Sequence, residues 1–570
     1  MKSITTSIEK MKDHYEIVVI GSGYGGGISA SRLSRAGRKV CLLERGKEYL
    51  PGEFPDNMDD MNKEMQFDTA IKKIGSPLGL FDYHISKDLN ILVGCGLGGT
   101  SLINANVGLH TDERVFNSEY WPKAFIDDIK DGVAEGYKAA ENMLKPVPYP
   151  DSYPPLDRLK ALSTSAKYVN QPFYRTPIYV NFEDRTNHIG VEQKACVNCG
   201  DCVAGCNYTA KNTTQMNYLP DAVQHGTEIF TKCNVSHIEK DGNSWKVHFS
   251  ILSIDQSDSG SQTQIVKADI VIVSAGTVGS SEIMLRSKAN GLALSDQTGM
   301  RLSGNGDVLG FTYNTDHEVN GLGFGPYKPG EQKPVGPGIT GIIDTRKTAE
   351  NYKDGFVIEE GSIPGAMGDT LPIAFAAVAA LEQTEKPINN GLIEKIKRWW
   401  RQRQSFKQGP RKGAVLNTQT YLLMGHDEGD GQIKLNKENR VVIDWPGVGD
   451  EPIFQKANDK LQECNDGLNG RYLKSPLWTK LFHKNLISVH PLGGCIMGEN
   501  VNIGVVNHKG QVFDAASEGA IHQGLYISDG SIVPTALGVN PSLTISAISE
   551  RNVKILCEDR GWTIDYSFNF

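Results

Sequence analysis

A glycine-rich turn near the start of the chain constrains its fold more than any other feature. Residues 21–26 (GSGYGG) match the pattern GxGxxG, directly after an apolar run at 15–20 and directly before a segment of helical composition at 28–36. A second apolar run at 40–43 follows, and Glu44 comes directly after it, 18 residues after Gly26. This order of strand, turn, helix, strand and acid is the dinucleotide-binding fingerprint, so we expect a Rossmann unit here.

Each residue type of this motif has a physical role beside a pyrophosphate. Gly21 allows the tight turn, Gly23 lets the backbone approach the phosphates, and Gly26 lets the helix pack closely on the strand. Tyr24 opens a helix whose first N–H groups face the phosphates, and Glu44 would accept hydrogen bonds from both ribose hydroxyls. The motif alone does not distinguish FAD from NAD.

The rest of this domain is predicted to come from distant parts of the chain. A third buried run at 270–273 ends in Ser274-Ala275-Gly276, which indicates a discontinuous Rossmann domain. Alternating segments at 244–251 and 431–443 indicate antiparallel strands of a second layer. The predicted fold class is α/β, with a Rossmann-type domain plus an α+β substrate domain that has a mainly antiparallel sheet. The first domain is assigned residues 10–110, 215–310 and 483–570, and the second residues 111–214 and 311–482.

Composition excludes several other classes of protein. The formal net charge of −8 argues against a basic nucleic-acid surface. The first fifteen residues contain no apolar run of secretory length, and the longest apolar stretch, 371–381, is about half of what spans a bilayer. We therefore expect a cytoplasmic protein without a nucleic-acid partner, in which residues 371–381 form a buried helix or a pocket wall.

Four further motifs, in order, identify a family. They lie at 94–104 (GCGLGGTSLIN), 274–280 (SAGTVGS), 489–494 (VHPLGG), and 528–531 (SDGS) followed by 538–541 (GVNP). With them the chain resembles the glucose–methanol–choline (GMC) oxidoreductases nearly end to end, and within them the cholesterol-oxidase branch. The resemblance implies FAD as the cofactor and alcohol oxidation at the flavin. Residues 313–480 match far less clearly, where family members hold their substrate-shaping elements.

The motifs also have physical interpretations of their own. The glycine run with Gly96 and Gly99 lets the backbone lie flat against a planar ligand, although a plain tight turn explains it too. Asp529 follows an apolar strand, where phosphates and sugars sit in doubly wound sheets. A helix starting after Asn540-Pro541 would direct its N-terminus at a reduced flavin and stabilise its negative charge. The resemblance implies FAD contacts at Glu44, Thr100, Asn104, Val107, Val235 and Gly530.

Three residues are candidates for the chemistry. Alcohol oxidation needs a group over the flavin that takes the hydroxyl proton, and His490 in VHPLGGC matches the position of the family's catalytic histidine. Asn540 is the expected second group, since an amide donates a hydrogen bond without changing charge. Glu359 resembles a proton-handling glutamate of cholesterol oxidases, but the adjacent Glu360 leaves the register open, and a solvated acidic turn is the alternative.

A cysteine cluster at 196–206 departs from the familiar cholesterol oxidases. Cys196, Cys199, Cys202 and Cys206 have the spacing C-x2-C-x2-C-x3-C of a bacterial ferredoxin loop, which predicts an iron–sulfur cluster inserted in the substrate domain. All four bind one cluster, or three bind with an outside ligand. Zinc, simple thiols and a disulfide are the alternatives. A cluster would pass electrons singly to a carrier, which favours a dehydrogenase over an oxidase.

The predicted function is thus FAD-dependent oxidation of a hydrophobic alcohol, sterol-like or long-chain, with a protein, quinone or oxygen as acceptor. The alternative is a non-catalytic electron-transfer or redox-sensing flavoprotein in which the cysteines are the working groups.

A basic segment at 391–403 suggests where a lipid-soluble substrate is collected. Ile393, Ile396 and Trp400 recur at helical spacing among lysines and arginines, as in peripheral membrane helices. Either this segment contacts a membrane surface, or its tryptophans pack inward beneath a solvated basic face.

Overall fold

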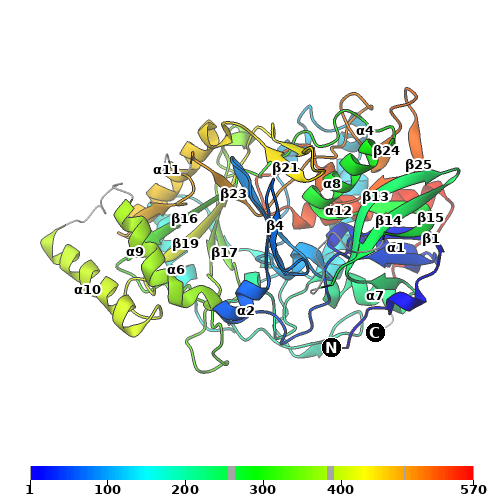
Figure 1. Cartoon of the computed structure of the whole chain (residues 1–570). Coiled ribbons are helices and arrows are strands. Elements are labelled where there is room, and N and C mark those ends of the chain that lie inside the picture. Colours follow the sequence, from blue (N-terminus) through cyan, green and yellow to red (C-terminus); the bar gives the residue numbers. More distant parts are fainter. Residues whose placement is uncertain (1, 254–262, 382–390, 480–482, 569–570) are drawn as a thin grey trace.

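The computed structural model describes residues 2–253, 263–381, 391–479 and 483–568 (Figure 1). Its largest sheet has eight strands, five of them parallel: β12 (Glu228–Phe230), β2 (Val40–Leu43), β1 (His14–Ile20), β15 (Gln264–Val273) and β25 (Ile521–Ile527). The predicted runs at 15–20, 40–43 and 270–273 are therefore confirmed as neighbouring parallel strands. They are apolar on both faces because helices cover both sides of a parallel sheet.

The segment 244–251 differs from expectation. It forms β14 (Ser244–Ile251), which pairs antiparallel with β13 (Cys233–Asp241) and with the first half of β15. The second half of β15 pairs with β25 instead, and β24 (Gln511–Phe513) pairs antiparallel with β25. The ten-residue strand β15 thus pairs antiparallel with β14 in its first half and parallel with β25 in its second half. The alternating segment extends the Rossmann sheet and is not part of a separate layer, because its buried side packs on the same core.

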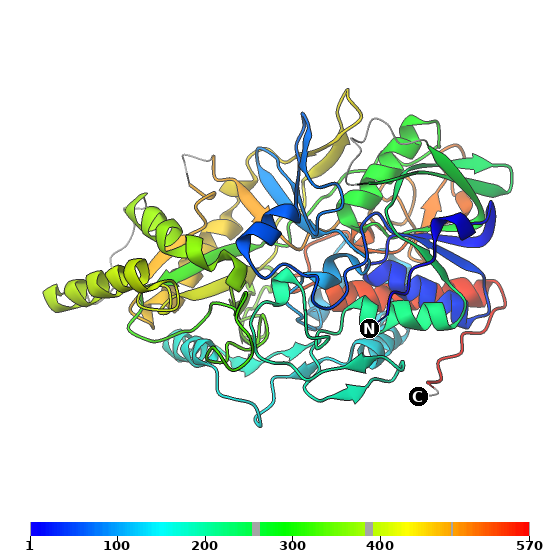
Figure 2. The ribbon, with the colours of Figure 1, turned by 60° about the horizontal axis from the view of Figure 1, so that its bottom comes forward.

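Helix α1 (Tyr24–Arg35) is fixed by two buried ion pairs. Arg32 pairs with Glu550 on α12 (Ser542–Asp559) at 2.7 Å, and Arg35 pairs with Asp221 on α7 (Tyr218–Gln224) at 2.6 Å. Tyr218 donates a further hydrogen bond of 2.7 Å to Glu550. Figure 2 shows the C-terminal α12 in red against the blue α1. The first and last long helices of the chain are thereby joined.

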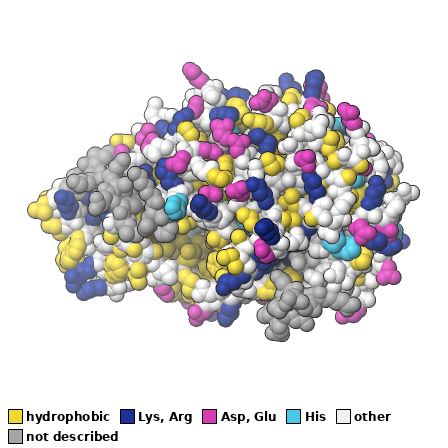
Figure 3. All heavy atoms as spheres, turned by 45° about the horizontal axis from the view of Figure 1, so that its top comes forward, with side chains coloured by type: hydrophobic (Ala, Val, Ile, Leu, Met, Phe, Trp, Pro, Cys, Tyr) yellow, Lys and Arg dark blue, Asp and Glu magenta, His cyan; other side chains and the backbone are white. Residues whose placement is uncertain are grey.

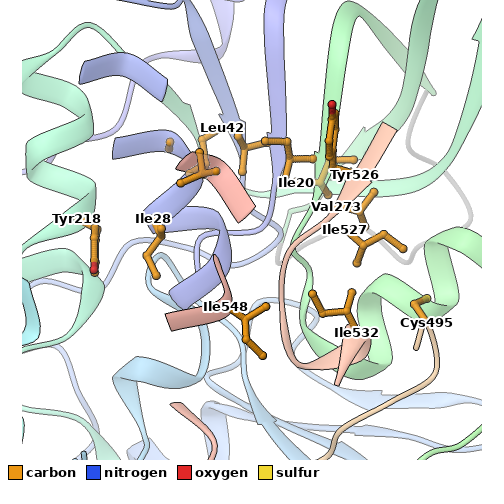
Figure 4. Close-up of a cluster of buried hydrophobic side chains, with 14 of the residues drawn as sticks. Ile20, Ile28, Leu42, Tyr218, Val273, Cys495, Tyr526, Ile527, Ile532 and Ile548 are labelled. Atoms are coloured by element: carbon orange, nitrogen blue, oxygen red, sulfur yellow. The ribbon is translucent and has the colours of Figure 1, made fainter. Parts of the chain in front are cut away.

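The core around this unit links strands and helices from distant segments. Figure 4 shows Ile20, Leu42 and Val273 from three neighbouring strands with Ile28 of α1 and Ile548 of α12. These side chains are at most 3% exposed. Such burial stabilises each by about 1.5–3 kcal/mol.

Two more sheets complete the fold. An antiparallel sheet of six strands has the order β22-β16-β19-β18-β17-β8 and is covered by α6 (Asp157–Tyr168) and α11 (Pro452–Asp466). Its strands are β22 (Arg471–Lys474), β16 (Val308–Tyr313), β19 (Gln419–Met424), β18 (Val357–Gly361), β17 (Gly341–Asp344) and β8 (Phe173–Arg175). A five-stranded sheet has the order β23 (Leu486–Ser488), β6 (Leu89–Gly94), β5 (Phe81–His84), β3 (Met65–Asp68) and β4 (Lys73–Gly75).

This architecture confirms the predicted fold class. The strands of the eight-stranded sheet all fall within the residues assigned to the Rossmann-type domain, while the domain boundaries as such stay a prediction. The segment 431–443 forms the hairpin β20 (Gln432–Leu435) and β21 (Val441–Asp444). Residues 371–381 are helix α9 (Leu371–Leu381), which projects with α10 (Leu392–Gln408) from the end of the molecule beside the six-stranded sheet (Figure 1). No helix among the described residues combines the length and apolar character that a membrane-spanning segment needs.

The buried ion pair between Arg32 and Glu550 generates the first prediction. Both side chains are about 1% exposed, so Glu550→Ala leaves a guanidinium buried without its carboxylate. We expect a loss of about 3–5 kcal/mol, seen as a large drop in the thermal midpoint. The double variant Arg32→Met/Glu550→Met should lose less, because no charge stays buried. Asp127→Ala is the matched control, since its pair with Lys123 is mostly exposed. Equal midpoints for Glu550→Ala and the control would contradict the assignment.

Candidate functional site

A cavity of about 1150 Å³ runs between the eight-stranded and the six-stranded sheets. Its wall brings together most of the residues singled out from the sequence, although they come from all three predicted segments of the first domain. Those lining it are Gly21, Gly23, Tyr24, Glu44, Gly99, Thr100, Asn104, Val107, Val235, His490, Asp529, Gly530 and Asn540. Gly26, Gly96 and Glu359 are not among the lining residues.

The turn between β1 and α1 packs by backbone contact. A Cβ on Gly21 would lie 2.2 Å from the carbonyl oxygen of Ser274, and one on Gly26 would lie 2.0 Å from that of Gly21. Gly23 instead has open space beside its Cα, at the N-cap of α1. Gly26 therefore serves helix–strand packing, as expected, and Gly23 leaves room for a ligand at the helix N-terminus.

Glu44 already accepts several hydrogen bonds. Its carboxylate takes the backbone N–H and hydroxyl of Ser22, at 3.1 and 2.5 Å, and the N–H of Gly46 at 2.7 Å. Burial raises the pKa of Glu44, and these hydrogen bonds offset part of the rise. The same carboxylate faces the cavity, where a ribose would add further donors.

The second glycine run lies against the first. A Cβ on Gly99 would be 3.0 Å from the Cα of Gly23, and the φ of Gly99 is +55°. Gly96 packs against Gly46 and Tyr49, away from the cavity. Behind the run, Asn104 donates a hydrogen bond of 2.6 Å to the hydroxyl of Tyr24. The two loops thus form one continuous surface on which an extended ligand can lie.

Asp529 connects the end of β25 to helix α8 (Gly276–Ala289). It accepts hydrogen bonds from the N–H of Gly276 at 2.9 Å and from the hydroxyl of Ser280 at 2.5 Å. Its other oxygen accepts from the N–H and hydroxyl of Ser531 at 2.9 and 2.6 Å. Asp529 therefore holds the cavity wall in shape besides lining it.

His490 follows β23 and is paired with an acid that the sequence did not single out. Its Nδ1 lies 2.8 Å from Oδ1 of Asp307, whose other oxygen accepts the N–H of Val489 and the hydroxyl of Ser488. Burial lowers the pKa of His490, but the carboxylates of Asp307 and Glu359 outweigh it and the net pKa is raised. Since the carboxylate accepts at Nδ1, the lone pair of neutral His490 lies on Nε2.

Glu359 and Glu360 point to opposite faces of β18. Glu360 is bound by Arg158 and by the N–H of Thr340 at 2.8 Å, in a buried structural pair. Glu359 accepts a hydrogen bond of 3.3 Å from the amide of Asn540. Burial raises the pKa of Glu359 to about 8, with the charge of His490 and this hydrogen bond opposing the rise. The alternation of a strand resolves the register: Glu359 is on the site's side, fully buried behind Asn540.

Two further polar residues hold this constellation together. Asn305 accepts hydrogen bonds from the N–H groups of Leu537 and Gly538 and donates one to the carbonyl of Val539, directly before Asn540. Asp427 binds the N–H groups of Gly304 and Gly306 at 2.9 Å each. The loop that carries Asp307 is thus tied to the segment that carries Asn540. Only the glycine-rich composition around Asn305 hinted at this loop.

The cavity fits the cofactor that the resemblance implies. Within the described residues, Oδ1 of Asn540 and Oε1 of Glu359 are buried and have no protein hydrogen-bond partner. Helix α12 begins at Ser542, two residues after Asn540, so its N-terminus faces the same region. A ligand that offers a polar edge to Asn540, with a pyrophosphate at Gly23, fits this wall, and FAD has both.

The cysteine loop lies between the cavity and the surface. Val203 lines the cavity, Cys202 is buried, and the other three cysteine residues are half-buried. Lys211 is buried and donates hydrogen bonds to the carbonyls of Cys202, Leu102 and Asn104, at 3.0, 2.9 and 2.6 Å, which joins this loop to the second glycine run.

The thiols themselves do not form a metal centre in this arrangement. All ten cysteines are free. Burial, the carboxylate of Asp201 and the neighbouring thiols raise the pKa of Cys199. Across the described part of the chain, which contains all four loop cysteines, no three His, Cys, Asp or Glu side chains are grouped so as to hold a metal ion. The spacing predicts a cluster that the side-chain positions do not support.

Comparisons with known proteins agree with this fold. Two family profiles described as GMC oxidoreductase match residues 25–299 and 448–549. A cholesterol oxidase of Mycobacterium tuberculosis is 27% identical over 95% of this chain and 91% of its own length. A long-chain-alcohol oxidase of Arabidopsis thaliana is 23% identical over 93% of this chain and 66% of its own. The structure of a fungal aryl-alcohol oxidase has a TM-score of 0.59 at 13% identity, covering 97% of this chain and all of that one, which shows the same fold.

The raised pKa of Glu359 predicts how stability depends on pH. An acid whose pKa is about 8 when folded and near 4.5 when unfolded binds more protons in the folded state. Its stabilising contribution is complete below about pH 4.5 and is lost as the pH rises to about 8. Glu359→Gln removes this titration, so its free energy of unfolding relative to that of the wild type should rise between pH 5 and 8 by on the order of a few kcal/mol, seen as a growing difference between the two thermal midpoints. Parallel midpoint curves would contradict the burial argument.

Proposed function

The chain belongs to the GMC oxidoreductase family, and from this premise we propose that it binds FAD in the cavity and oxidises a hydrophobic alcohol there. The observation that carries the proposal is the convergence of His490 and Asn540 on the wall of a cavity whose other end is the dinucleotide motif. When bound, FAD supplies the acceptor for the hydride that leaves the carbinol carbon.

The protein's own groups handle the hydroxyl proton. Neutral His490 accepts it at Nε2, because Nδ1 is occupied by Asp307 at 2.8 Å. The adjacent carboxylate raises the pKa of His490, which makes it a stronger base and stabilises the imidazolium that results. Asn540 positions the alcohol oxygen by hydrogen bonding, and Glu359 lies behind it with a pKa that burial raises.

The lining supports a hydrophobic substrate. Beside His490, the part of the cavity under the six-stranded sheet is formed by Leu309, Phe311, Ile363, Phe375, Leu422 and Leu473. Apolar walls with a few convergent polar groups are typical of sites for bulky apolar ligands. The names of the relatives, cholesterol oxidase and long-chain-alcohol oxidase, point to the same substrate class.

The cysteine loop favours a carrier over oxygen as the final acceptor. Thiols alone as donors suit an iron–sulfur cluster, and the N–H of Asn198 donates to Sγ of Cys196 at 3.4 Å. The positions of the cysteine side chains argue against a metal cluster, and the relatives, which are named oxidases, argue for oxygen as the acceptor. No step of the alcohol chemistry depends on this loop. If the cysteines were the working groups of a non-catalytic flavoprotein, no alcohol would reduce the flavin.

The role of His490 is tested by single-turnover flavin reduction without oxygen. His490→Ala should keep bound, yellow FAD and lose about 10²–10⁴ in the rate of reduction by a long-chain alcohol or a sterol. Asp307→Asn should keep the ring in place but weaken the base, so its loss should be smaller. An unchanged rate in His490→Ala removes this residue from the mechanism, and no reduction of the wild type by any alcohol in a broad panel favours the non-catalytic flavoprotein.

The content of the cysteine loop is tested by analysis of anaerobically purified protein. If the loop holds the cluster that its spacing predicts, iron and acid-labile sulfide should accompany FAD, and Cys199→Ala should lose the iron while retaining flavin. Cys464→Ala is the matched control, because that buried thiol lies outside the loop. Stoichiometric zinc without sulfide, or no metal at all, would contradict an iron–sulfur cluster.

A further inference from the structure

Helix α10 exposes its apolar side and turns its polar side to the protein. Its least exposed residues recur at helical spacing: Glu394, Arg398, Arg401 and Ser405. Arg401 donates to Oδ1 of Asn314 at 2.7 Å and pairs with Asp316 at 3.1 Å, and Ser405 donates to the carbonyl of Lys412 at 2.5 Å. Polar side chains therefore attach this helix to the body of the protein.

The opposite side carries large hydrophobic side chains into solvent. At about 100° per residue, Leu392, Ile396 and Trp399 lie diametrically across the helix from the attached side. Ile393, Trp400 and Phe406 flank them. The exposed fractions are 75% for Leu392, 69% for Ile393, 51% for Trp399 and 54% for Trp400. The sequence alternative in which these tryptophans pack inward is thus wrong. A helix of a water-soluble domain normally has the reverse arrangement, so this face is built for a partner.

Helix α9 continues the apolar surface to the entrance of the cavity. It contains no charged residue, and its exposed residues are Ile373, Ala374, Ala377 and Ala380. Its inner side lines the cavity through Leu371, Phe375 and Val378. Ala374 and Met367 are both exposed and cavity-lining, so the cavity opens along this helix. The helices pack against each other, and Figure 3 shows hydrophobic side chains gathered at this end of the molecule.

Positively charged side chains surround the exposed apolar face of α10. Helix α10 has six Lys and Arg residues and one Glu, in a chain of net charge −8. Lys395 and Lys397 lie on either side of this apolar face. Arg403 and Lys407 lie on the same side of the helix as the apolar face, nearer its C-terminal end. Apolar residues flanked by cations, with tryptophans at the boundary, match the interface of a bilayer with anionic headgroups. The apolar residues at the cavity entrance belong to the same surface. A membrane that supplies the substrate explains this, whereas a protein partner does not.

We propose that α9 and α10 rest on an anionic membrane and that the lipid-soluble alcohol enters the cavity from the bilayer beside α9. The docking itself is independent of the reaction, whereas substrate entry rests on the proposed alcohol oxidation. The exposed apolar side chains leave water and contact the acyl chains just below the headgroups, and the basic residues contact the headgroups themselves. The protein then collects from the membrane a substrate that is scarce in water.

Docking is tested with the FAD-containing full chain and vesicles of phosphatidylcholine alone or with one third phosphatidylglycerol. The wild type should sediment with the anionic vesicles at low salt, with a blue shift of tryptophan emission. Trp399→Ser/Trp400→Ser should lower the partition coefficient at least tenfold. Lys395→Glu/Lys397→Glu should lower it about fivefold or more per reversed charge, and only at low salt. Ile265→Ser/Ile503→Ser is the matched control, since these exposed isoleucines lie on other elements, and it should bind like the wild type.

Two activity measurements separate docking from catalysis. With a short, water-soluble alcohol, the tryptophan variant should reduce its flavin at the wild-type rate, because it leaves the cavity intact. With a long-chain alcohol embedded in anionic vesicles, it should fall at least tenfold. Equal sedimentation of the wild type and the tryptophan variant overturns the proposal, as does a wild type that binds no vesicles and self-associates through this face. Failure of every alcohol in the presence of normal vesicle binding would instead overturn the proposed function.

Discussion

Close backbone approach at glycine is the constraint on which the site depends. The turn after β1 touches the ends of two neighbouring strands: a Cβ on Gly21 would lie 2.2 Å from the carbonyl oxygen of Ser274, and one on Gly25 would lie 1.5 Å from that of Ser528. No side chain fits at either position. The carboxyl ends of β1, β15 and β25 therefore meet only because these residues lack a Cβ, and this meeting point is where doubly wound sheets bind their ligands. A Cβ on Gly99 would lie 3.0 Å from the Cα of Gly23, so the second glycine run reaches the same point.

The reactive end of the cavity is assembled from three separate elements. His490 follows a strand of the five-stranded sheet, Glu359 lies on the six-stranded sheet, and Asn540 precedes the last long helix. The loop with Asn305 and Asp307 connects them, because Asp307 binds the imidazole and Asn305 binds the backbone before Asn540. A buried network whose members satisfy one another fixes a single arrangement of these groups. Asn540, whose Oδ1 has no protein partner among the described residues, lines the cavity where the ligand is expected, and Glu359 lies buried behind it.

The two other distinctive features lie at different sides of this cavity. The cysteine loop approaches it through Val203 and is joined to the second glycine run by the buried Lys211, which donates three hydrogen bonds. Helices α9 and α10 lie at the apolar end, where exposed and cavity-lining residues coincide. The cysteine loop and the apolar helices therefore lie at different parts of the cavity wall.

Local sequence determined the elements whose physics is local. The parallel strands, the turn at 21–26, helix α9 and the roles of Gly21 and Gly26 follow from apolar runs and from the conformational freedom of glycine. The resemblance added the expected cofactor and singled out His490, Asn540 and Glu359 as candidates. What the tertiary structure decided depends on contacts between distant residues. It placed β14 in the Rossmann sheet, paired Asp307 with His490, and turned Glu359 toward Asn540 and Glu360 toward Arg158. It also oriented α10, because the amphipathic pattern gives the angle between the apolar and polar sides of a helix and not which side faces the protein. That orientation was set by Asn314 and Asp316, which lie far from α10 in the sequence and bind its Arg401.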